Sequence, residues 1–316
     1  MNITCRASAL ASSGAMAERT WLPYTVLLIG VAAVSWSAIL IREATAPFLI
    51  IACYRLVLAS VPVGVVALVQ HRRSPEAFVG KTFALMVLSG ALLAAHFAFW
   101  VSSLQHTSVV TSVVLVAMQP LFVAIASPLL LREKVEPHVW AALLIATIGA
   151  VTMVGEDIGD GLGTLAGDFY ALLGGAFAAA YLMIGRSVRP TTSFSRYIGV
   201  VYTVSAICLL AALLISGDDL TGYSTKTYVM IGLLALGPQL IGHSSINWSL
   251  AYLSAVVVAM AILLEPVGTT ALAVLILDEQ PTIAEMAGGV LVLIGVYLAI
   301  RPRKEERLEA EIASAD

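Results

Sequence analysis

Two ionisable side chains stand deep inside long apolar segments of this 316-residue sequence. Arg55 lies about eight residues into an apolar run over 47–70, or about 12 Å at 1.5 Å per residue. Glu265 lies near the centre of a run over 252–277. Ionisable residues in such surroundings are costly, and they usually pair with one another or line a water-filled pathway. Arg55 and Glu265 could therefore form a structural ion pair. Alternatively, each could face a cavity in which the guanidinium of Arg55 binds a carboxylate through two parallel hydrogen bonds.

A proline follows Glu265, and the same pattern recurs where Pro120 follows Gln119. Proline frees a backbone carbonyl one turn back and bends a helix, so a polar side chain beside it can line a cavity. Burial disfavours the charged form of a carboxyl, which would allow Glu265 to carry a proton. The alternative is a capped kink with a neutral, hydrogen-bonded Glu265.

Two further polar pairs have the spacing of one helical turn. His96 and Trp100 form the first pair, and His243 and Asn247 form the second. The two pairs fall on equivalent segments of the two halves of the chain described below, so they could face a shared central space. The structural alternative is that each histidine only donates a hydrogen bond to a neighbouring helix.

The remaining candidates for contact with a ligand are aromatic. Trp36 and Tyr54 could stack on a substrate, although packing and interfacial roles explain such residues equally well. Gly-rich nucleotide motifs, HExxH and CxxC are absent from the sequence, and its three cysteines stand far apart. The sequence thus predicts no cofactor, no metal site and no catalytic constellation, and the protein is not expected to be an enzyme.

The composition indicates which class of protein holds these residues. Hydrophobic residues make up 59% of the chain and charged residues only 12%, with a mean hydropathy of +0.94. A soluble domain carries about 25% charged residues, whereas a membrane-spanning helix needs about 20 mainly apolar residues. Ten such runs predict an all-α integral membrane fold of ten transmembrane helices. They lie at 22–41, 47–70, 83–103, 108–131, 137–154, 167–185, 197–215, 227–249, 252–277 and 282–300.

Basic residues predict the orientation of these helices. With the N-terminus inside, 14 of the 17 Lys and Arg residues fall in inner segments, while Glu156, Asp160 and Asp219 fall in outer loops. Both termini are therefore predicted to be cytoplasmic, in the plasma membrane or, in a bacterium, the inner membrane. Residues 1–21 lack the apolar core of a signal peptide and predict a disordered tail, with Met1 or Met16 as the natural start. The net charge of −3 argues against a nucleic-acid partner.

The chain also repeats itself, because a shift of 146 residues aligns the stretch from Leu104 with that from Leu250 without a gap. Five helices in each half is an odd number, so the halves are predicted to lie in opposite orientations. Inverted repeats are typical of secondary transporters; duplication kept only for helix packing is the alternative. The aligned pairs share residue types that an apolar composition does not supply, namely Pro120 and Pro266, Glu133 and Glu279, and Gly149 and Gly295.

The repeated segments resemble the EamA family of the drug/metabolite transporter superfamily. The resemblance rests on MQPLFVAIASPLLLREKVEPHVWAALLIATIGAV and LEPVGTTALAVLILDEQPTIAEMAGGVLVLIGVYL, and also on GDFYALLGGAFAAAYLMIGR and VSWSAILIREATAPFLIIACYRL. One departure is that Ala141 and Ala142 stand near the position that Gly288 and Gly289 hold in the second half. The resemblance implies five parts: a tail over 1–21, a first repeat over 22–154, an external linker over 155–166, a second repeat over 167–301 and a charged cytoplasmic tail over 302–316.

The residues and the resemblance together imply a secondary active transporter that works by alternating access. We expect an exporter of small metabolites such as amino acids or related compounds, because the family handles amino acids, other metabolites and drugs. Its expected partners are a small-molecule substrate and the lipid bilayer, and either protons as the coupling ion or the substrate gradient alone would drive transport. Drug efflux, a channel and a non-transport scaffold are the alternatives, and the oligomeric state stays open.

Overall fold

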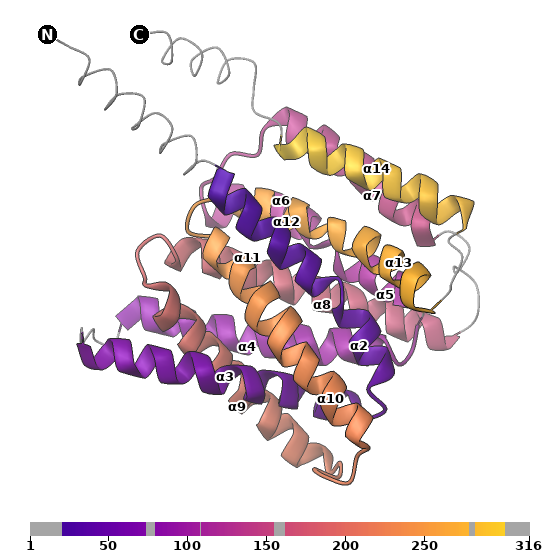
Figure 1. Ribbon diagram of the computed structural model, residues 1–316. Helices are drawn as coiled ribbons and strands as arrows, with labels where there is room; N and C mark the ends of the chain where they lie inside the picture. The colour runs from indigo at the N-terminus through magenta and orange to yellow at the C-terminus, as the bar shows by residue number, and fades with distance from the viewer. Residues whose placement is uncertain (1–20, 74–79, 108, 155–161, 278–281, 301–316) are drawn as a thin grey trace, which may run out of the picture.

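The computed structural model describes residues 21–73, 80–107, 109–154, 162–277 and 282–300, which form helices joined by short connections (Figure 1). The outer surface of this bundle is apolar, with large side chains such as Ile215, Leu129 and Leu275 exposed by 85%, 82% and 77%. Such a surface suits lipid rather than water. Eight helices in the described part are long and apolar enough to cross a bilayer. They are Trp21–Glu43, Phe48–Arg73, Gly80–Ser103, Thr111–Leu130, Leu165–Val188, Phe194–Ser216, Thr225–Ser249 and Ala255–Ile276.

The last helix of each half is shorter than the others, so the count of spans differs from the ten expected. α7 (Pro137–Val154) and α14 (Ile283–Ile300) have 18 residues each. A helix of that length rises about 27 Å, slightly less than a hydrocarbon core of about 30 Å. Length and composition therefore identify eight spans among the described residues and leave α7 and α14 as shorter apolar helices.

Four of the predicted spans are interrupted near their middle. The helix over 21–34 continues beyond a turn at 35–36 as α2 (Ser37–Glu43). In the first half, α5 (Val109–Val116) is followed by α6 (Gln119–Leu130). In the second half, α12 (Ala255–Ile262) is followed by α13 (Leu264–Leu277). The fourth span consists of α10 (Thr225–Leu234), the π-helix η1 (Ala235–His243) and α11 (Ser244–Ser249).

Prolines explain three of these four interruptions. α5 ends four residues before Pro120, α10 ends four residues before Pro238, and α12 ends four residues before Pro266. A proline ring clashes with the carbonyl four residues back, and its nitrogen cannot donate a hydrogen bond. Because Pro120 and Pro266 are aligned by the repeat, the breaks at 117–118 and at 263 are equivalent as well.

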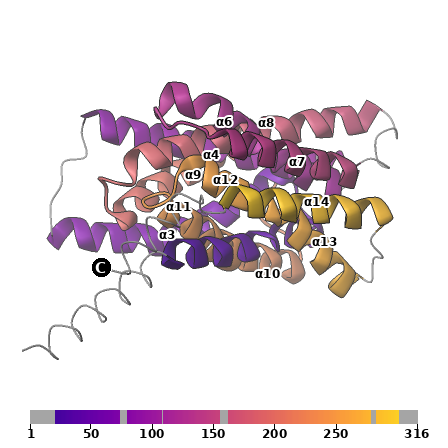
Figure 2. The same cartoon turned by 90° about the horizontal axis from the view of Figure 1, so that it is seen from above.

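The most extensive helix–helix contacts join the first half of the chain to the second. α3 (Phe48–Arg73) packs on α9 (Phe194–Ser216), α7 packs on α14, and α5 and α6 pack on α13 and α12. α4 (Gly80–Ser103) packs on α8 (Leu162–Val188), and in the equivalent pair α2 packs on α10. If each helix is replaced by its equivalent in the other half, the same set of packed helix pairs results. α7 and α14 lie side by side in both views (Figures 1 and 2), and Figure 1 shows them along one edge of the bundle.

Glycines bring α7 and α14 into backbone contact. A Cβ atom at Gly149 would lie 2.6 Å from the carbonyl oxygen of Gly288, and one at Gly295 would lie 2.7 Å from that of Ala142. Gly149 aligns with Gly295 and Ala142 with Gly288, so these two contacts are equivalent. Residue numbers rise along one helix as they fall along the other, which means that the two helices run antiparallel. Ala142 thus replaces a glycine without breaking the symmetry of the contact.

An ion pair joins the two halves at the end of the bundle where α8 ends. Arg186 of α8 donates from Nε to Glu133 at 2.6 Å and from Nη1 to the carbonyl oxygen of Leu250 at 3.1 Å. The second carboxylate oxygen of Glu133 accepts from the backbone N–H of Ala255 at 3.4 Å. Glu133 therefore links the α6–α7 connection to both α8 and the start of α12. The remaining predictions, on Glu279, on the loop over 156–160 and on the tails over 1–20 and 302–316, lie outside the described residues.

Candidate functional site

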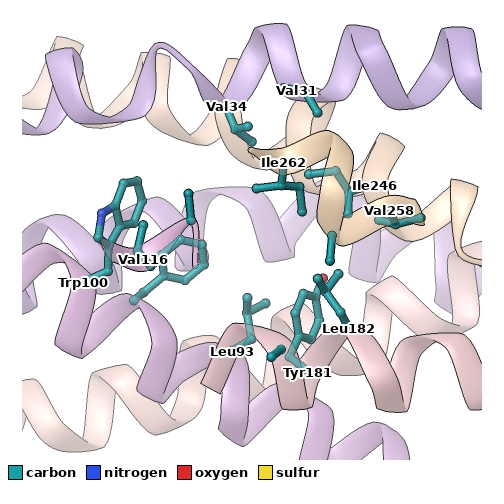
Figure 3. Packing of buried hydrophobic residues seen from close by; sticks show 14 of the residues in the cluster. Val31, Val34, Leu93, Trp100, Val116, Tyr181, Leu182, Ile246, Val258 and Ile262 are labelled. Carbon is teal, nitrogen blue, oxygen red and sulfur yellow. The ribbon is translucent and has the colours of Figure 1, made fainter. Parts of the chain in front are cut away.

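A small cavity lies where the interrupted helices meet α4 and α8. Its volume is about 30 Å³, enough for roughly two water molecules at about 15 Å³ each. Figure 3 shows Trp100, Tyr181 and Leu182 on one side of this region and Val34 and Ile262 on the other. Side chains of both halves line it, and they are Val34, Ser37, His96, Trp100, Val116, Gln119, Ala178, Tyr181, Leu182, His243, Ile246, Ile262 and Glu265.

The equivalent helix breaks supply two of the polar lining residues. Gln119 is the first residue of α6 and Glu265 the second residue of α13, and both are nearly buried at 5% and 7% exposure. The first turn of a helix leaves backbone N–H groups without intrahelical partners and carries a partial positive charge. This position offsets part of the cost of burying an acidic residue inside an otherwise apolar bundle.

Histidines from opposite halves meet at the cavity. The ring of His96 on α4 lies 6.2 Å from that of His243 in η1 and stacks on Trp100 at 5.8 Å. His96 Nδ1 lies 2.9 Å from the carbonyl oxygen of Gly174, so Nδ1 is the donor and Nε2 is left as an acceptor in the neutral ring. Buried Nε1 of Trp100 and Nδ1 of His243 have no hydrogen-bond partner among the described residues.

Arg55 lies close to this cavity but does not line it. Its side chain is fully buried, and Nε donates to Oε1 of Gln239 at 2.9 Å. Cζ lies 4.2 Å from the ring centroid of Phe97, which also lies 5.1 Å from the ring of His243 and 4.8 Å from that of His96. Phe97 therefore contacts both the guanidinium and the two histidines of the cavity.

The direct partners of Arg55 are Gln239 and Phe97. Within the described residues no ion pair or hydrogen bond joins Arg55 to Glu265, and Nη1 and Nη2 of Arg55 have no hydrogen-bond partner. The guanidinium contacts one amide oxygen and one aromatic face. Its two buried Nη donors have no acceptor among the described residues.

Gln239 and Phe97 were not among the residues singled out from the sequence. Gln239 carried a signal, because it is a polar residue next to Pro238 in an apolar run. Phe97 carried none, since it is one of nine phenylalanines and only its neighbour His96 drew attention. Gln239 also connects to α9, because the hydroxyl of Tyr202 donates to its carbonyl oxygen at 3.2 Å and lies 3.1 Å from Ser244 Oγ.

The three remaining candidates lie outside the cavity. Asn247 is buried, and its Nδ2 donates to the hydroxyl of Tyr181 and to the carbonyl oxygen of His243 at 2.7 Å. It therefore holds lining residues in position. Trp36 is 42% exposed, and the hydroxyl of Tyr54 donates to the carbonyl oxygen of Leu220 near one end of the bundle. Neither lines the cavity.

No group of three or more His, Cys, Asp or Glu side chains in the described part is placed to hold a metal ion. What the cavity lining offers instead is a carboxyl, two imidazoles, an indole, a phenol and one amide group, with a buried guanidinium nearby. Polar groups at breaks in paired helices, inside an apolar bundle of two equivalent halves, define the architecture of a membrane transporter.

Comparison with known proteins agrees with this class and makes it more specific. The chain belongs to the EamA-like transporter family, which matches residues 21–155 and 165–301. It is therefore an integral membrane protein and a transporter, with a small-molecule substrate and a lipid environment.

Individual relatives are distant. An uncharacterized transporter of Archaeoglobus fulgidus is 24% identical over 217 residues, which is 68% of this chain and 74% of that protein. The pseudopaline exporter CntI of Pseudomonas aeruginosa is 24% identical over 221 residues, or 70% and 76% of the two chains. One crystal structure of a protein superposes with a TM-score of 0.72 at 16% identity, covers 90% of this chain and 97% of that one, and shows the fold alone.

Proposed function

We propose that this transporter is a secondary active exporter of small zwitterionic metabolites, such as amino acids or related compounds. The observation that carries the proposal is the opposite charges of two buried groups in one site. Glu265 faces the cavity, and Arg55 beside it has two unpartnered donors among the described residues. A guanidinium with free Nη groups suits a substrate carboxylate, and a carboxyl at the other side suits a substrate amine or a proton.

The transport cycle that we infer is alternating access. A cavity of about 30 Å³ is far below the roughly 300–1,000 Å³ of a typical small-molecule site, so this conformation is closed around the site. Opening requires the two halves to move relative to each other. In the open state a substrate carboxylate would take the place of the Phe97 ring at Arg55. Protonation of Glu265 in one facing state and its release in the other would couple transport to a proton gradient.

The proposed topology has ten membrane-crossing helices, with α7 and α14 as the fifth and tenth. Their antiparallel contact supports two repeats of opposite orientation, over 22–154 and 167–301, joined by an external linker over 155–166. Helices of 18 residues can span a bilayer that thins slightly around them. The distribution of Lys and Arg supports cytoplasmic termini in the plasma membrane, which in a bacterium is the inner membrane.

Export is supported by one distant relative that bears the name pseudopaline exporter. Efflux of cationic drugs is a second candidate, and one observation favours it. Glu265 lines the cavity directly together with Trp100 and Tyr181, whereas Phe97 covers Arg55. A lipophilic cation would need the carboxylate and the aromatic faces but not the guanidinium.

The test is counterflow by purified protein in liposomes, with and without an imposed pH gradient. The probes are labelled alanine, glutamate and lysine, together with pseudopaline and tetraphenylphosphonium. The variants are Arg55→Gln, Arg55→Lys and Glu265→Gln. Glu43→Gln is the matched control, because Glu43 pairs with Lys226 away from the cavity.

We expect at least one of the zwitterionic probes to be exchanged by the wild type and by Glu43→Gln. Arg55→Gln should lower the rate at least about tenfold, as expected from losing hydrogen bonds to a charged group worth about 1.5–3 kcal/mol each. Arg55→Lys should also be impaired because lysine lacks the planar fork. Glu265→Gln should lose the response to the pH gradient while passive exchange remains.

Transport of tetraphenylphosphonium alone, unaffected by Arg55→Gln, would favour drug efflux. Wild-type behaviour of both Arg55→Gln and Glu265→Gln would refute the assigned site.

A further inference from the structure

A second and larger cavity lies on the side of the bundle between α3, α9 and the η1–α11 segment. Its volume is about 450 Å³, and among the described residues it shares no lining residue with the small cavity of the candidate site. Val66, Ile198 and Leu240 make its walls apolar, and Val66 is 49% exposed on the outer surface of the helix. A hydrogen bond from Ser195 to Gln70 lies at its end. We call this cavity the lateral groove.

The position of the lateral groove limits what can occupy it. It opens on the apolar outer surface of a protein that lies in a membrane, so hydrocarbon chains are the molecules that reach it. Its size falls within the range of about 300–1,000 Å³ that accommodates a small ligand. A lipid acyl chain matches both the apolar walls and the volume.

Charge at one end of the lateral groove indicates the kind of lipid. Val66, Gln70 and Arg73 are spaced by four and three residues along α3, so they share one face of the helix. Arg72 and Arg73 form the exposed last turn of α3, and Arg196 lies in the first turn of α9 beside Ser195. Basic residues between membrane helices near a bilayer surface recognise anionic headgroups.

We propose that the lateral groove binds one anionic phospholipid. An acyl chain lies between Val66, Ile198 and Leu240, and the phosphate group lies at Arg72 and Arg73. The lipid belongs to the leaflet in which α3 ends.

The lateral groove is also connected to the candidate transport site. Ser244 lines the groove, and its Oγ lies 3.1 Å from the hydroxyl of Tyr202. That hydroxyl donates to the backbone of Gln239, whose side chain accepts from Arg55. A lipid that orders the groove therefore also orders the partner of Arg55, so the transport rate should depend on the lipid. This consequence rests on the proposed function, whereas binding of the lipid does not.

The experiment measures lipid retention by native mass spectrometry of the full-length protein. Purified protein is mixed with equal amounts of phosphatidylglycerol and phosphatidylcholine that carry identical acyl chains. Val66→Trp fills the groove, and the double variant Arg72→Gln/Arg73→Gln removes the charges. Val65→Trp is the matched control, because Val65 is 57% exposed on the same helix but does not line the groove.

We expect the wild type and Val65→Trp to retain one phosphatidylglycerol that Val66→Trp loses. Two arginines should favour phosphatidylglycerol over phosphatidylcholine by about 25-fold, at about fivefold for each basic residue near an anionic surface. The double variant should lose this preference. Equal retention of both lipids by the wild type would overturn the proposal, as would full retention by Val66→Trp. Neither result depends on a transported substrate, so a failure of the proposed function would not be mistaken for a failure of lipid binding. If Val66→Trp does not fold, the wild type and the double variant still decide the question.

Discussion

The contact between Phe97 and Arg55 should contribute measurably to the stability of the empty transporter. Arg55 is fully buried and makes no ion pair or hydrogen bond with an anionic group among the described residues, and its direct contacts are with Gln239 and the Phe97 ring. The distance of 4.2 Å from Cζ to the ring centroid is well within the 6 Å limit of a cation–π contact. In a desolvated setting such a contact contributes about 2 kcal/mol.

The perturbation is a double-mutant cycle of Phe97→Leu and Arg55→Met. Phe97→Leu keeps an apolar side chain but removes the aromatic face, and Arg55→Met keeps an unbranched chain but removes the charge. Each single change also alters packing, and the cycle subtracts those separate costs. We expect a coupling free energy of about 2 kcal/mol, because the interaction exists only when both partners are present.

The assay is equilibrium unfolding in mixed micelles of dodecyl maltoside and SDS. Phe99→Leu supplies the control cycle, because Phe99 lies on the same helix but stacks on Phe177 at 5.5 Å rather than on Arg55. Its coupling to Arg55→Met should be near zero, within the roughly 0.3–0.5 kcal/mol expected of independent sites. A Phe97–Arg55 coupling no larger than that of the control would show that the ring does not compensate the charge. The proposal that a substrate carboxylate takes the place of the Phe97 ring beside Arg55 would then be wrong.

Two further predictions concern the fold and its orientation. Gly288→Val should lower the free energy of unfolding by about 1–3 kcal/mol through overpacking, because its Cβ would meet the carbonyl oxygen of Gly149 and the side chain of Met153. In the same micelle assay Gly289→Val should cost little, since its Cβ meets only Val267 Cγ2 at 3.9 Å, and equal losses would refute the antiparallel contact. In a cysteine-free background, a membrane-impermeant thiol reagent added to whole cells should label Asp218→Cys but not Arg72→Cys. The reverse pattern would invert the proposed topology.

The helices were predictable from the sequence, but their interruptions were predictable only in part. Runs of about 20 apolar residues identify spans because no other structure satisfies the backbone inside a bilayer. Pro120, Pro238 and Pro266 then mark three breaks. Pro62 and Pro128 lie inside α3 and α6 without ending them. Whether neighbouring helices accommodate a bend at a proline depends on packing, which a single sequence does not contain.

The residues of the candidate site were likewise predictable from the sequence only in part. Arg55 and Glu265 were detectable because a charge in an apolar run is rare, and Gln119 was detectable through the repeat. Of the two alternatives left open for them, the structure contains no ion pair between Arg55 and Glu265 among the described residues. Arg55 instead meets Gln239, a residue 184 positions away. Such a contact depends on how η1 crosses α3, and neither hydropathy nor spacing determines that crossing.

The repeat is preserved in the backbone but not in the chemistry of the site, and this difference bears on coupling. Pro120 and Pro266 interrupt their helices at equivalent positions. The first helical turn after each break then places Gln119 on one side of the site and Glu265 on the other. If the two halves exchange conformations during transport, the start of α6 takes the surroundings that the start of α13 had, and the reverse. The partial charges at these two helix starts are then equivalent in the two states. The amide of Gln119 has the same protonation state in both conformations, whereas Glu265 can gain or lose a proton. A difference in proton affinity between the two states can therefore arise at this level only through Glu265. One titratable helix break in a symmetric scaffold would therefore be enough to couple proton binding to the exchange of the two states, while the gradients across the membrane set the direction of flow.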